Sequence, residues 1–225
     1  FITLTYLDNN SLPASIVKEI EKARIKAKTS TYWANWWKVY GLGEIGSLEG
    51  ACIPDWKSID TIPSDARLLC AGLDFGYSVD PSTFIRLYKW NNSYIFDELL
   101  YRKGMLNRDI SHFLKDKQIS ENIYADSAEP KSISEIRSYG HKIFPVTKGR
   151  DSVIYGINLI SQNEIYVTLR SKNLIRELQG YVWDKDKEGN NIQKPTGIHP
   201  DCIDAARYAL MMQLENPNRG KYAII

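Results

Sequence analysis

Cysteine is scarce in this sequence, and its spacing excludes the common structural uses of the residue. Only three cysteines occur among 225 residues, Cys52, Cys70 and Cys202, and no two of them form a CxxC pair. An odd number of widely separated cysteines does not suit a disulfide framework, and the missing CxxC pairs argue against a zinc site. The pattern favours a protein of a reducing compartment.

Long apolar runs and phosphate-binding motifs are also missing. No stretch approaches the roughly 18 apolar residues of a membrane span, and no secretory signal opens the chain, so we expect no membrane association. The absence of GxxxxGK[ST] means that the chain as given does not bind ATP through a phosphate-binding loop. The net charge of +2 neither indicates nor opposes a nucleic-acid partner. Because the chain opens on "FITLTYLDNN" without methionine, we expect a fragment of a longer protein.

Residues 1–65 are predicted to form a helical segment followed by a linker. Apolar residues at Ile16, Ile20 and Ala23 recur at helical spacing, which predicts helix within 13–40. An aromatic cluster follows, and its spacing is typical of a buried helical face, although such side chains could also stack on bases; its members are Tyr32, Trp33, Trp36, Trp37 and Tyr40. Residues 46–66 carry glycines, prolines and acids without periodicity and are interpreted as a linker.

Residues 66–225 are predicted to form a single α/β domain. Apolar runs at 67–77, 82–90 and 93–101 predict an antiparallel meander with a tight turn at "NN", and "NRDISHFLKDKQI" predicts a helix capped by Asn107. Strands and helices then alternate, with a helix expected over 171–183, an exposed hairpin or loop over 184–197, and a last helix in "HPDCIDAARYALMMQLE". This order predicts a mixed sheet with helices on both faces.

Three acids occupy positions that suit a binding site. Asp74 closes the first strand of the meander, Asp126 closes the next predicted strand, and Asp204 lies in the last helix. Each alone could be a cap or a turn residue, but sites of open α/β sheets gather beyond the carboxyl ends of strands. Converging carboxylates repel one another unless a cation is present, and hard divalent ions prefer oxygen ligands. The three acids therefore predict a site for Mg²⁺ or Mn²⁺, with two ions able to hydrolyse a phosphodiester.

Five segments together resemble the C-terminal nuclease domain of large terminase subunits from tailed bacteriophages. They are "GLDFGYSVDPS", "IYADSAEP", "VTKGRDSVIYGINLI", "YVWDKDKEGN" and "HPDCIDAARYAL". "TYLDNNSLP" and "WKVYGLGEIGSLEGACIP" resemble the end of the terminase ATPase domain. The resemblance implies an RNase H-like fold and a two-metal endonuclease that cuts concatemeric double-stranded viral DNA. It also implies a portal protein and a small terminase subunit as partners of the full motor, and the cytoplasm of an infected bacterium as the location. We expect the isolated fragment to be monomeric.

The resemblance assigns roles to individual residues. It places the two ions on Asp74, Asp126 and Asp204, and puts Asp201 where relatives often carry an acid or a histidine. Lys148 follows a predicted strand at the same rim as the acids and is interpreted as a phosphate contact or a stabiliser of transition-state charge, with a plain surface lysine as the alternative. A phosphate-binding track could be added by Arg150, Lys185, Lys187 and Lys194, although a merely solvated surface explains these residues equally well.

Alternatives remain at this level. Another RNase H-like DNA enzyme, such as a transposase or a junction resolvase, would share the acids, and a non-catalytic docking fragment of the motor would not cut DNA at all. Asp201 lies in the first turn of the last helix, where an acid also favours the helix dipole. Asp204 is expected to be buried, where an unpaired acid is costly unless a metal ion is bound. Replacing Asp204 by asparagine is therefore predicted to eliminate cleavage without lowering heat stability in the absence of divalent ions.

Overall fold

The structure is a computed structural model that describes residues 5–9, 11–28, 37, 41–42, 50–149 and 151–215. The chain forms two compact units, one comprising Phe1–Pro54 and Leu178–His199, the other Asp55–Glu177 and Pro200–Ile225. None of the helices in the described ranges is long and apolar enough to cross a membrane.

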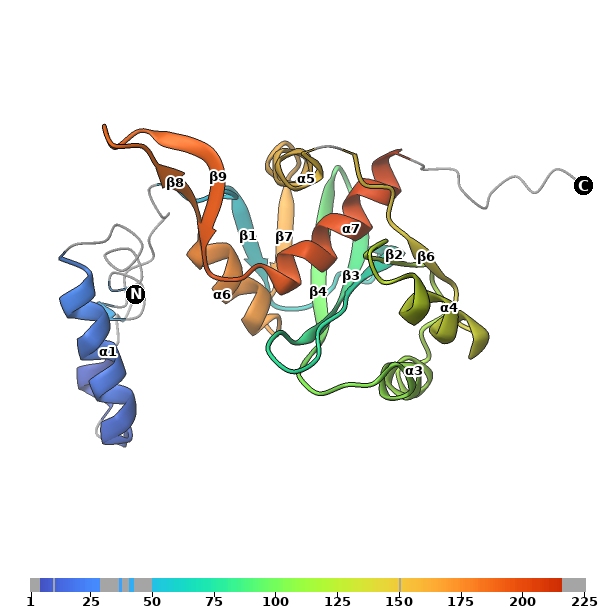
Figure 1. Ribbon diagram of the computed structural model, residues 1–225, viewed down its shortest axis with the longest axis horizontal. Coiled ribbons are helices and arrows are strands. Elements are labelled where there is room, and N and C mark those ends of the chain that lie inside the picture. The colour runs from blue at the N-terminus through green and yellow to red at the C-terminus, as the bar shows by residue number, and fades with distance from the viewer. Residues whose placement is uncertain are drawn as a thin grey trace, which may run out of the picture. The chain divides into compact units, whose positions relative to one another are not determined.

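The larger unit is built on a seven-stranded mixed sheet (Figure 1). Its spatial order is β1-β7-β4-β3-β2-β5-β6. β3 runs antiparallel to β2 and β4, and the other neighbouring strands pair in parallel. The bounds are β1 (Trp56–Ile59), β2 (Arg67–Asp74), β3 (Ser82–Trp90), β4 (Ser93–Arg102), β5 (Ile123–Ala125), β6 (Ile143–Pro145) and β7 (Ile165–Thr168). The predicted meander is β2-β3-β4, with Asn91 in its tight turn at a positive φ of 50°.

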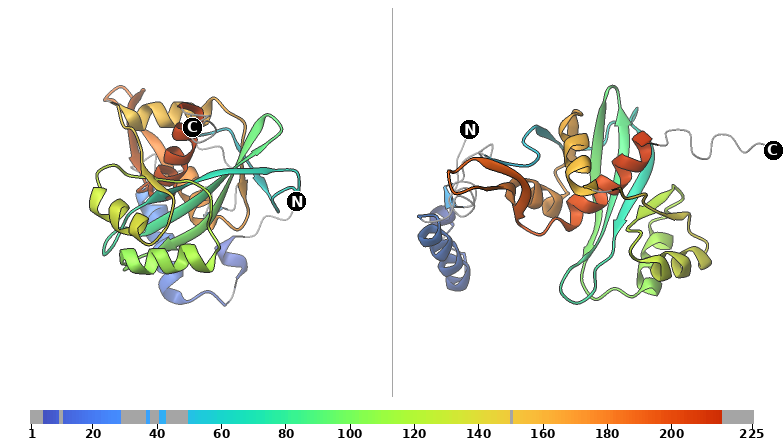
Figure 2. Two further views of the ribbon diagram at one scale, coloured as in Figure 1. Left: turned by 90° about the vertical axis from the view of Figure 1, so that its right-hand side faces the viewer. Right: turned by 45° about the horizontal axis from the view of Figure 1, so that its top comes forward.

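Helices cover both faces of this sheet (Figure 2). α3 (Asn107–Asp116) and α4 (Pro130–Ser138) pack on one face, while α5 (Ser152–Ser161) and α7 (Asp201–Glu215) pack on the other. α6 (Lys172–Gly180) follows β7 in the chain. The mixed α/β architecture with helices on both faces confirms the predicted fold class. Asn107 is the first residue of α3 rather than its cap, and its side-chain amide donates a 2.8 Å hydrogen bond to Glu135.

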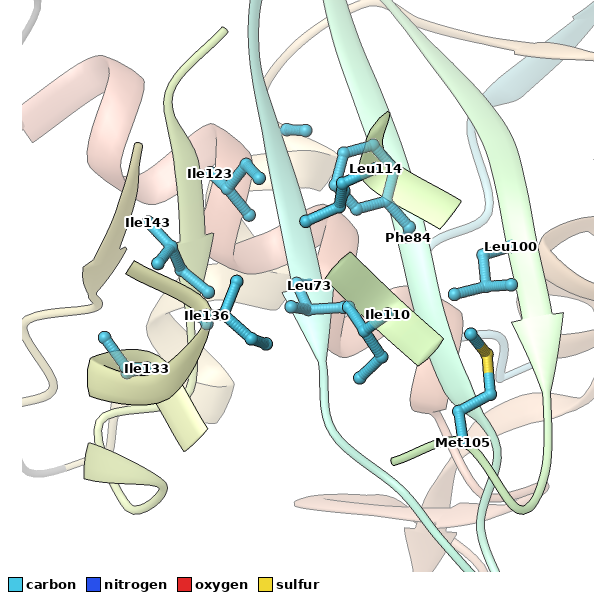
Figure 3. Close-up of a cluster of buried hydrophobic side chains, with 12 residues drawn as sticks. Leu73, Phe84, Leu100, Met105, Ile110, Leu114, Ile123, Ile133, Ile136 and Ile143 are labelled. Atoms are coloured by element: carbon cyan, nitrogen blue, oxygen red, sulfur yellow. The ribbon is translucent and has the colours of Figure 1, made fainter. Parts of the chain in front are cut away.

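One hydrophobic cluster lies between the sheet and the α3–α4 layer (Figure 3). Leu73 of β2 and Ala125 of β5 belong to it, together with Ile110 of α3 and Ile136 of α4. Side chains alternate between the two faces of a strand. Because Leu73 and Ala125 face α3 and α4, the residues that follow them, Asp74 and Asp126, point to the opposite side, where α7 lies.

α7 approaches β2 very closely on that opposite side. Gly72 makes the approach possible, because a Cβ atom at this position would lie 1.8 Å from the backbone oxygen of Ala205. Alanines at 205, 206 and 209 are almost completely buried in the same helix, which keeps its sheet-facing side narrow. The Cys70 thiol also lies 3.5 Å from the Ala209 carbonyl oxygen. Small residues on both elements thus bring the helix backbone against the end of β2.

The segment interpreted as a linker contributes a strand to the sheet. β1 pairs in parallel with β7, from Trp56 opposite Ile165 to Ile59 opposite Thr168. This four-residue edge strand has no clear alternation, with only its first and last residues partly buried, so its pattern does not identify it. The proposed division of the chain at residue 65 stays a prediction.

The smaller unit contains η1 (Tyr6–Asp8), α1 (Ala14–Lys26) and a hairpin of β8 (Tyr181–Lys185) and β9 (Asn191–Gly197). The hairpin agrees with the prediction for 184–197. The helix predicted over 171–183 is wrong in its last turn, because 181–183 lie in β8 and pair with β9. The Trp183 amide also donates to the Gly50 carbonyl at 2.8 Å. Of the aromatic cluster, Trp37 lies within the described residues, and Tyr32, Trp33, Trp36 and Tyr40 lie outside them.

Candidate metal centre

Asp74 and Asp126 lie side by side at one edge of the sheet. β2 and β5 are parallel neighbours, and Leu73 is in register with Ala125, so the two acids that follow come at equivalent positions. β6 pairs in parallel with β5, which places the segment leading to Lys148 at the same edge. This is the edge at which open α/β sheets build their sites.

The first turn of α7 is held against this edge by hydrogen bonds. Thr83, which is in register with Asp74, donates its hydroxyl to the Asp201 carbonyl oxygen at 2.9 Å. The buried carboxylate of Glu177 accepts from the Ile203 amide at 3.0 Å. With Gly72 admitting the helix backbone at Ala205, these contacts place Asp204 beside Asp74.

The pKa of Asp74 reflects both its burial and the charges of the neighbouring acids. Burial raises the pKa of Asp74 to about 8, and the charges of Asp204, Asp201 and Asp126 contribute to this rise, in that order. The charge of Lys148 opposes this rise in pKa. The structure therefore brings together all four acids predicted for the site and the predicted lysine. Asp201 is buried, and one of its carboxylate oxygens lies within 4.8 Å of one of Asp80.

Asp126 is paired with Lys148. The lysine ammonium lies 2.6 Å from Oδ1, which also accepts from the Ala128 amide at 2.8 Å. Tyr208 of α7 donates its hydroxyl to Oδ2 at 3.3 Å and accepts from Lys148 at 3.2 Å. Burial alone would raise the pKa of Asp126, but the Ala128 amide, Lys148 and Tyr208 outweigh it and lower that pKa. Asp126 is thus held in its charged form.

Asp204 is paired with a buried arginine. Arg207, one turn further along α7, donates to Asp204 Oδ1 through Nη2 at 2.7 Å and through Nε at 3.1 Å. Its side chain is only 2% exposed. Both donors use the same oxygen, so the second carboxylate oxygen of Asp204 takes no part in this pair. The sequence leads us to expect only a metal ion to offset the charge of Asp204, so this pair with Arg207 was not predicted.

The chemistry of this group fits divalent cations. It offers carboxylate oxygens, the ligands that Mg²⁺ and Mn²⁺ prefer. Burial and then the neighbouring acids raise the pKa of Asp74, and a bound cation would favour its charged form. Asp74, Asp126 and Asp204 stay the predicted ligands of such ions, and Asp201 lies with Asp204 in the first turn of α7.

Of the other predicted DNA contacts, three belong to the smaller unit and one lies outside the described residues. Lys185 and Lys194 lie on the β8–β9 hairpin and Lys187 lies in its connection, all in the smaller unit. The Lys194 ammonium is 3.4 Å from an Asp184 carboxylate oxygen, and both side chains are substantially exposed. Arg150 lies outside the described residues. A role for these four residues in DNA binding stays a prediction.

Comparison with known proteins decides the family. A family model described as "Terminase RNAseH like domain" matches residues 74–212, which span the sheet from the end of β2 and run through α7. The chain belongs to this terminase family. The match begins at Asp74 and includes Asp126, Lys148 and Asp204, so the acid group lies wholly inside the terminase RNase H-like domain.

Relatives of known identity agree with this terminase assignment. The large terminase subunit of Bacillus phage SPP1 is 31% identical over 220 residues, covering 91% of this chain and 50% of the relative. A crystal structure of the SPP1 large terminase nuclease domain with bound Mn has a TM-score of 0.60 and 32% identity, covering 71% of this chain and 97% of that domain. The large terminase of a thermophilic bacteriophage shares the fold at a TM-score of 0.58 and 22% identity, covering 94% of this chain and 55% of that one. The chain spans about half the length of the curated relatives it matches.

Arg207, Tyr208 and Gly72 were not predicted as parts of the terminase site. A spacing of three residues between Asp204 and Arg207 places both on one helix face, so the sequence did contain a signal for that pair. Tyr208 looks like a core residue in sequence. Gly72 lies inside an apolar strand, where a glycine often marks a close backbone approach.

Gly72 offers a direct test of how the site is assembled. Replacing it by alanine should force α7 away from β2, because the new Cβ would lie 1.8 Å from a backbone oxygen that cannot rotate aside. We expect a loss of stability of roughly 1–3 kcal/mol or more. Thermal unfolding would measure it, with Gly149→Ala as the control, since a Cβ built there meets open space. Unchanged stability of Gly72→Ala would contradict the close packing.

Proposed function

We propose that this domain is a metal-dependent endonuclease that hydrolyses phosphodiester bonds of double-stranded DNA. The main support for the proposal is the convergence of Asp126, Asp201 and Asp204 on Asp74, whose pKa is raised to about 8 by burial first and then by their charges. The SPP1 nuclease domain, which was crystallised with bound Mn, supports a divalent ion as the cofactor of the domain.

The acids and Lys148 have different proposed roles in phosphodiester hydrolysis. Two divalent ions, when bound, supply an activated water and neutralise the leaving oxygen of a phosphodiester. Asp74, on which the charges of the other three acids act, is proposed as the shared ligand, with Asp126 and Asp204 as further ligands and Asp201 as a helper. Lys148 supplies a positive charge for a phosphate of the bound strand.

We propose that the whole protein acts in a viral DNA-packaging motor. There the domain would cut concatemeric DNA inside the infected bacterium, together with the portal protein and the small terminase subunit. Among the described residues of the site, none is arranged to read base edges, so backbone contacts would dominate and sequence specificity would be low.

Plasmid cleavage tests the proposal most directly. Supercoiled plasmid should be nicked and linearised with Mn²⁺ or Mg²⁺ and left intact with a chelator. A parallel assay on plain duplex and four-way junctions separates this activity from that of a junction resolvase, which would prefer the junction. No cleavage with either metal would leave the domain as a docking fragment.

Lys148 can be tested through the salt dependence of DNA binding. If its ammonium contacts one phosphate, Lys148→Ala should lower the slope of log K against log salt by about one unit. Binding to a short duplex is best measured by anisotropy with Ca²⁺ present, so that a divalent ion is available to the acids. Lys57→Ala is a suitable control, because Lys57 also pairs with a carboxylate, that of Glu164 at 2.7 Å. Equal slopes for Lys148→Ala and the wild type would make Lys148 an ordinary surface lysine.

A further inference from the structure

Two of the three principal acids carry a cation of the protein itself, and the two ion pairs are built differently. Lys148 reaches Asp126 with one ammonium group, and its side chain is 30% exposed. Arg207 reaches Asp204 with two donors of a planar guanidinium and is 2% exposed. An ammonium on a flexible stem exchanges partners readily, whereas a buried guanidinium with several fixed donors does not.

The packing around Arg207 keeps it in place. Its Nη1 group donates to the Ser152 carbonyl oxygen at the start of α5, at 3.2 Å. α5 makes room for the side chain at Gly156, where a Cβ would lie 2.8 Å from Arg207 Cδ and 3.1 Å from Nη1. The guanidinium is therefore enclosed between α5 and α7, and it cannot leave Asp204 without opening the contact between these helices.

Lys148 has a second partner besides Asp126, the side chain of Tyr208. Its ammonium lies 4.9 Å from the centre of the Tyr208 ring and within hydrogen-bond reach of the Tyr208 hydroxyl. If it left Asp126 it could remain over this ring, since cations bind aromatic faces. Lys148 also competes for the oxygen that a divalent ion would use, because its ammonium sits 2.6 Å from Asp126 Oδ1.

We propose that Lys148 is an exchangeable cation that leaves Asp126 when a divalent ion binds, while Arg207 is a positioning residue that stays on Asp204 and fixes the direction of its second oxygen. The proposal rests on the proposed metal-dependent function and specifies how the acid group is loaded. It implies that metal and DNA favour each other's binding, since a DNA phosphate gives the displaced Lys148 a new partner and coupling between two ligands is reciprocal.

Calorimetric titration with Mn²⁺ in the absence of DNA tests the exchange. Lys148→Met removes the competing charge and should tighten Mn²⁺ binding about tenfold or more. Lys57→Met is the matched control, since Lys57 pairs with Glu164 at 2.7 Å and lies 5.6 Å from the centre of the Tyr166 ring, yet belongs to the edge strand β1. Its Mn²⁺ affinity should equal that of the wild type. Equal or weaker Mn²⁺ binding by Lys148→Met would overturn the exchange.

The same titration tests the positioning role. Arg207→Lys keeps the charge but loses the two-donor contact, so Mn²⁺ binding should weaken about 10–100-fold, as when partners behind metal ligands are removed. The matched control is Arg86→Lys. Arg86 lies on β3 and forms a partly buried ion pair with Glu121, with 2.5 Å between Nε and Oε1, so this change should leave Mn²⁺ affinity unchanged. Wild-type Mn²⁺ affinity in Arg207→Lys would refute the positioning role.

If Arg207→Lys does not fold, Gly156→Ala takes its place. An alanine inside a helix is normally stabilising relative to glycine, so weaker Mn²⁺ binding in this variant would come from displacement of Arg207, and unchanged binding would count against the proposal. The inference and the proposed function fail separately. If the wild-type protein cuts plasmid but the variants keep the wild-type Mn²⁺ affinity, only the inference about Lys148 and Arg207 is refuted. If the variants show the expected changes in Mn²⁺ affinity but the wild-type protein leaves plasmid uncut, only the proposed nuclease function is refuted.

Discussion

Replacing Asp74 by asparagine should abolish metal-dependent cleavage and leave the fold intact. The carboxamide keeps the shape of the side chain at the end of β2 but removes the charge that the proposed shared ligand needs. The charges of Asp126, Asp201 and Asp204 all raise the pKa of this one carboxylate. We therefore expect that none of these three acids can replace Asp74 as a ligand. The measurement is nicking of supercoiled plasmid with Mn²⁺, alongside circular dichroism. Nicking at the wild-type rate would exclude Asp74 from the site.

The same variant should be at least as stable as the wild type in chelator. The pKa of Asp74 is about 8 in the folded protein and near 4 in an unfolded chain. The folded state therefore binds the extra proton between these values, and the wild type loses stability as the pH rises through that window. Asparagine does not titrate, so its advantage should be larger at pH 8 than at pH 5. Asp116→Asn, at an exposed position of α3, should show no such trend.

The sequence could predict where the acids gather because the rule involved is local. An acid after an apolar run lies at a strand end, and parallel strands bring their carboxyl ends to one edge. Asp74 and Asp126 needed no more than this, and the small residues that follow Asp204 indicated close packing of the last helix. The family resemblance added Lys148 and Asp201 to the predicted site. The predicted family and the predicted fold class are both confirmed.

What the sequence could not predict depends on distances between segments far apart in the chain. The contact of Lys148 with Asp126 requires β5 and β6 to be neighbours, and the enclosure of Arg207 requires Gly156 of α5 to face α7. Neither pairing leaves a periodic trace in the sequence. β1 was missed for the same reason, because a short edge strand with two exposed residues resembles a loop until its partner β7 is known.

Asp204→Asn is the variant for which the structure reverses an expectation. We still expect loss of cleavage, since a proposed ligand of the ions loses its charge. Stability in chelator should now fall rather than hold, by roughly 1–3 kcal/mol, because Arg207 is left buried without an anionic partner. Thermal unfolding in chelator measures the change, and a variant as stable as the wild type would mean that the Arg207 pair contributes little.

A double replacement shows whether the loss of stability comes from the unpaired charge of Arg207 or from the packing of α7. Asp204→Asn combined with Arg207→Met removes both charges, so it should recover part of the stability that the single change loses, without recovering cleavage. The difference between the double variant and the two single variants gives the interaction energy of the pair. Additive losses would place the destabilisation elsewhere, for example in the packing of α7 against β2.

Asp201→Asn is the comparison that locates the centre along α7. Asp201 and Asp204 share one helix face, one turn apart, and Asp204 raises the pKa of Asp74 more strongly than Asp201 does. Asp201→Asn should therefore weaken cleavage and not eliminate it. If Asp201→Asn were inactive and Asp204→Asn active, the ions would be held by Asp201, the first residue of α7, and not by Asp204. The pair of Asp204 with Arg207 would then be purely structural, and Asp80, whose carboxylate lies within 4.8 Å of that of Asp201, would become the next ligand to test.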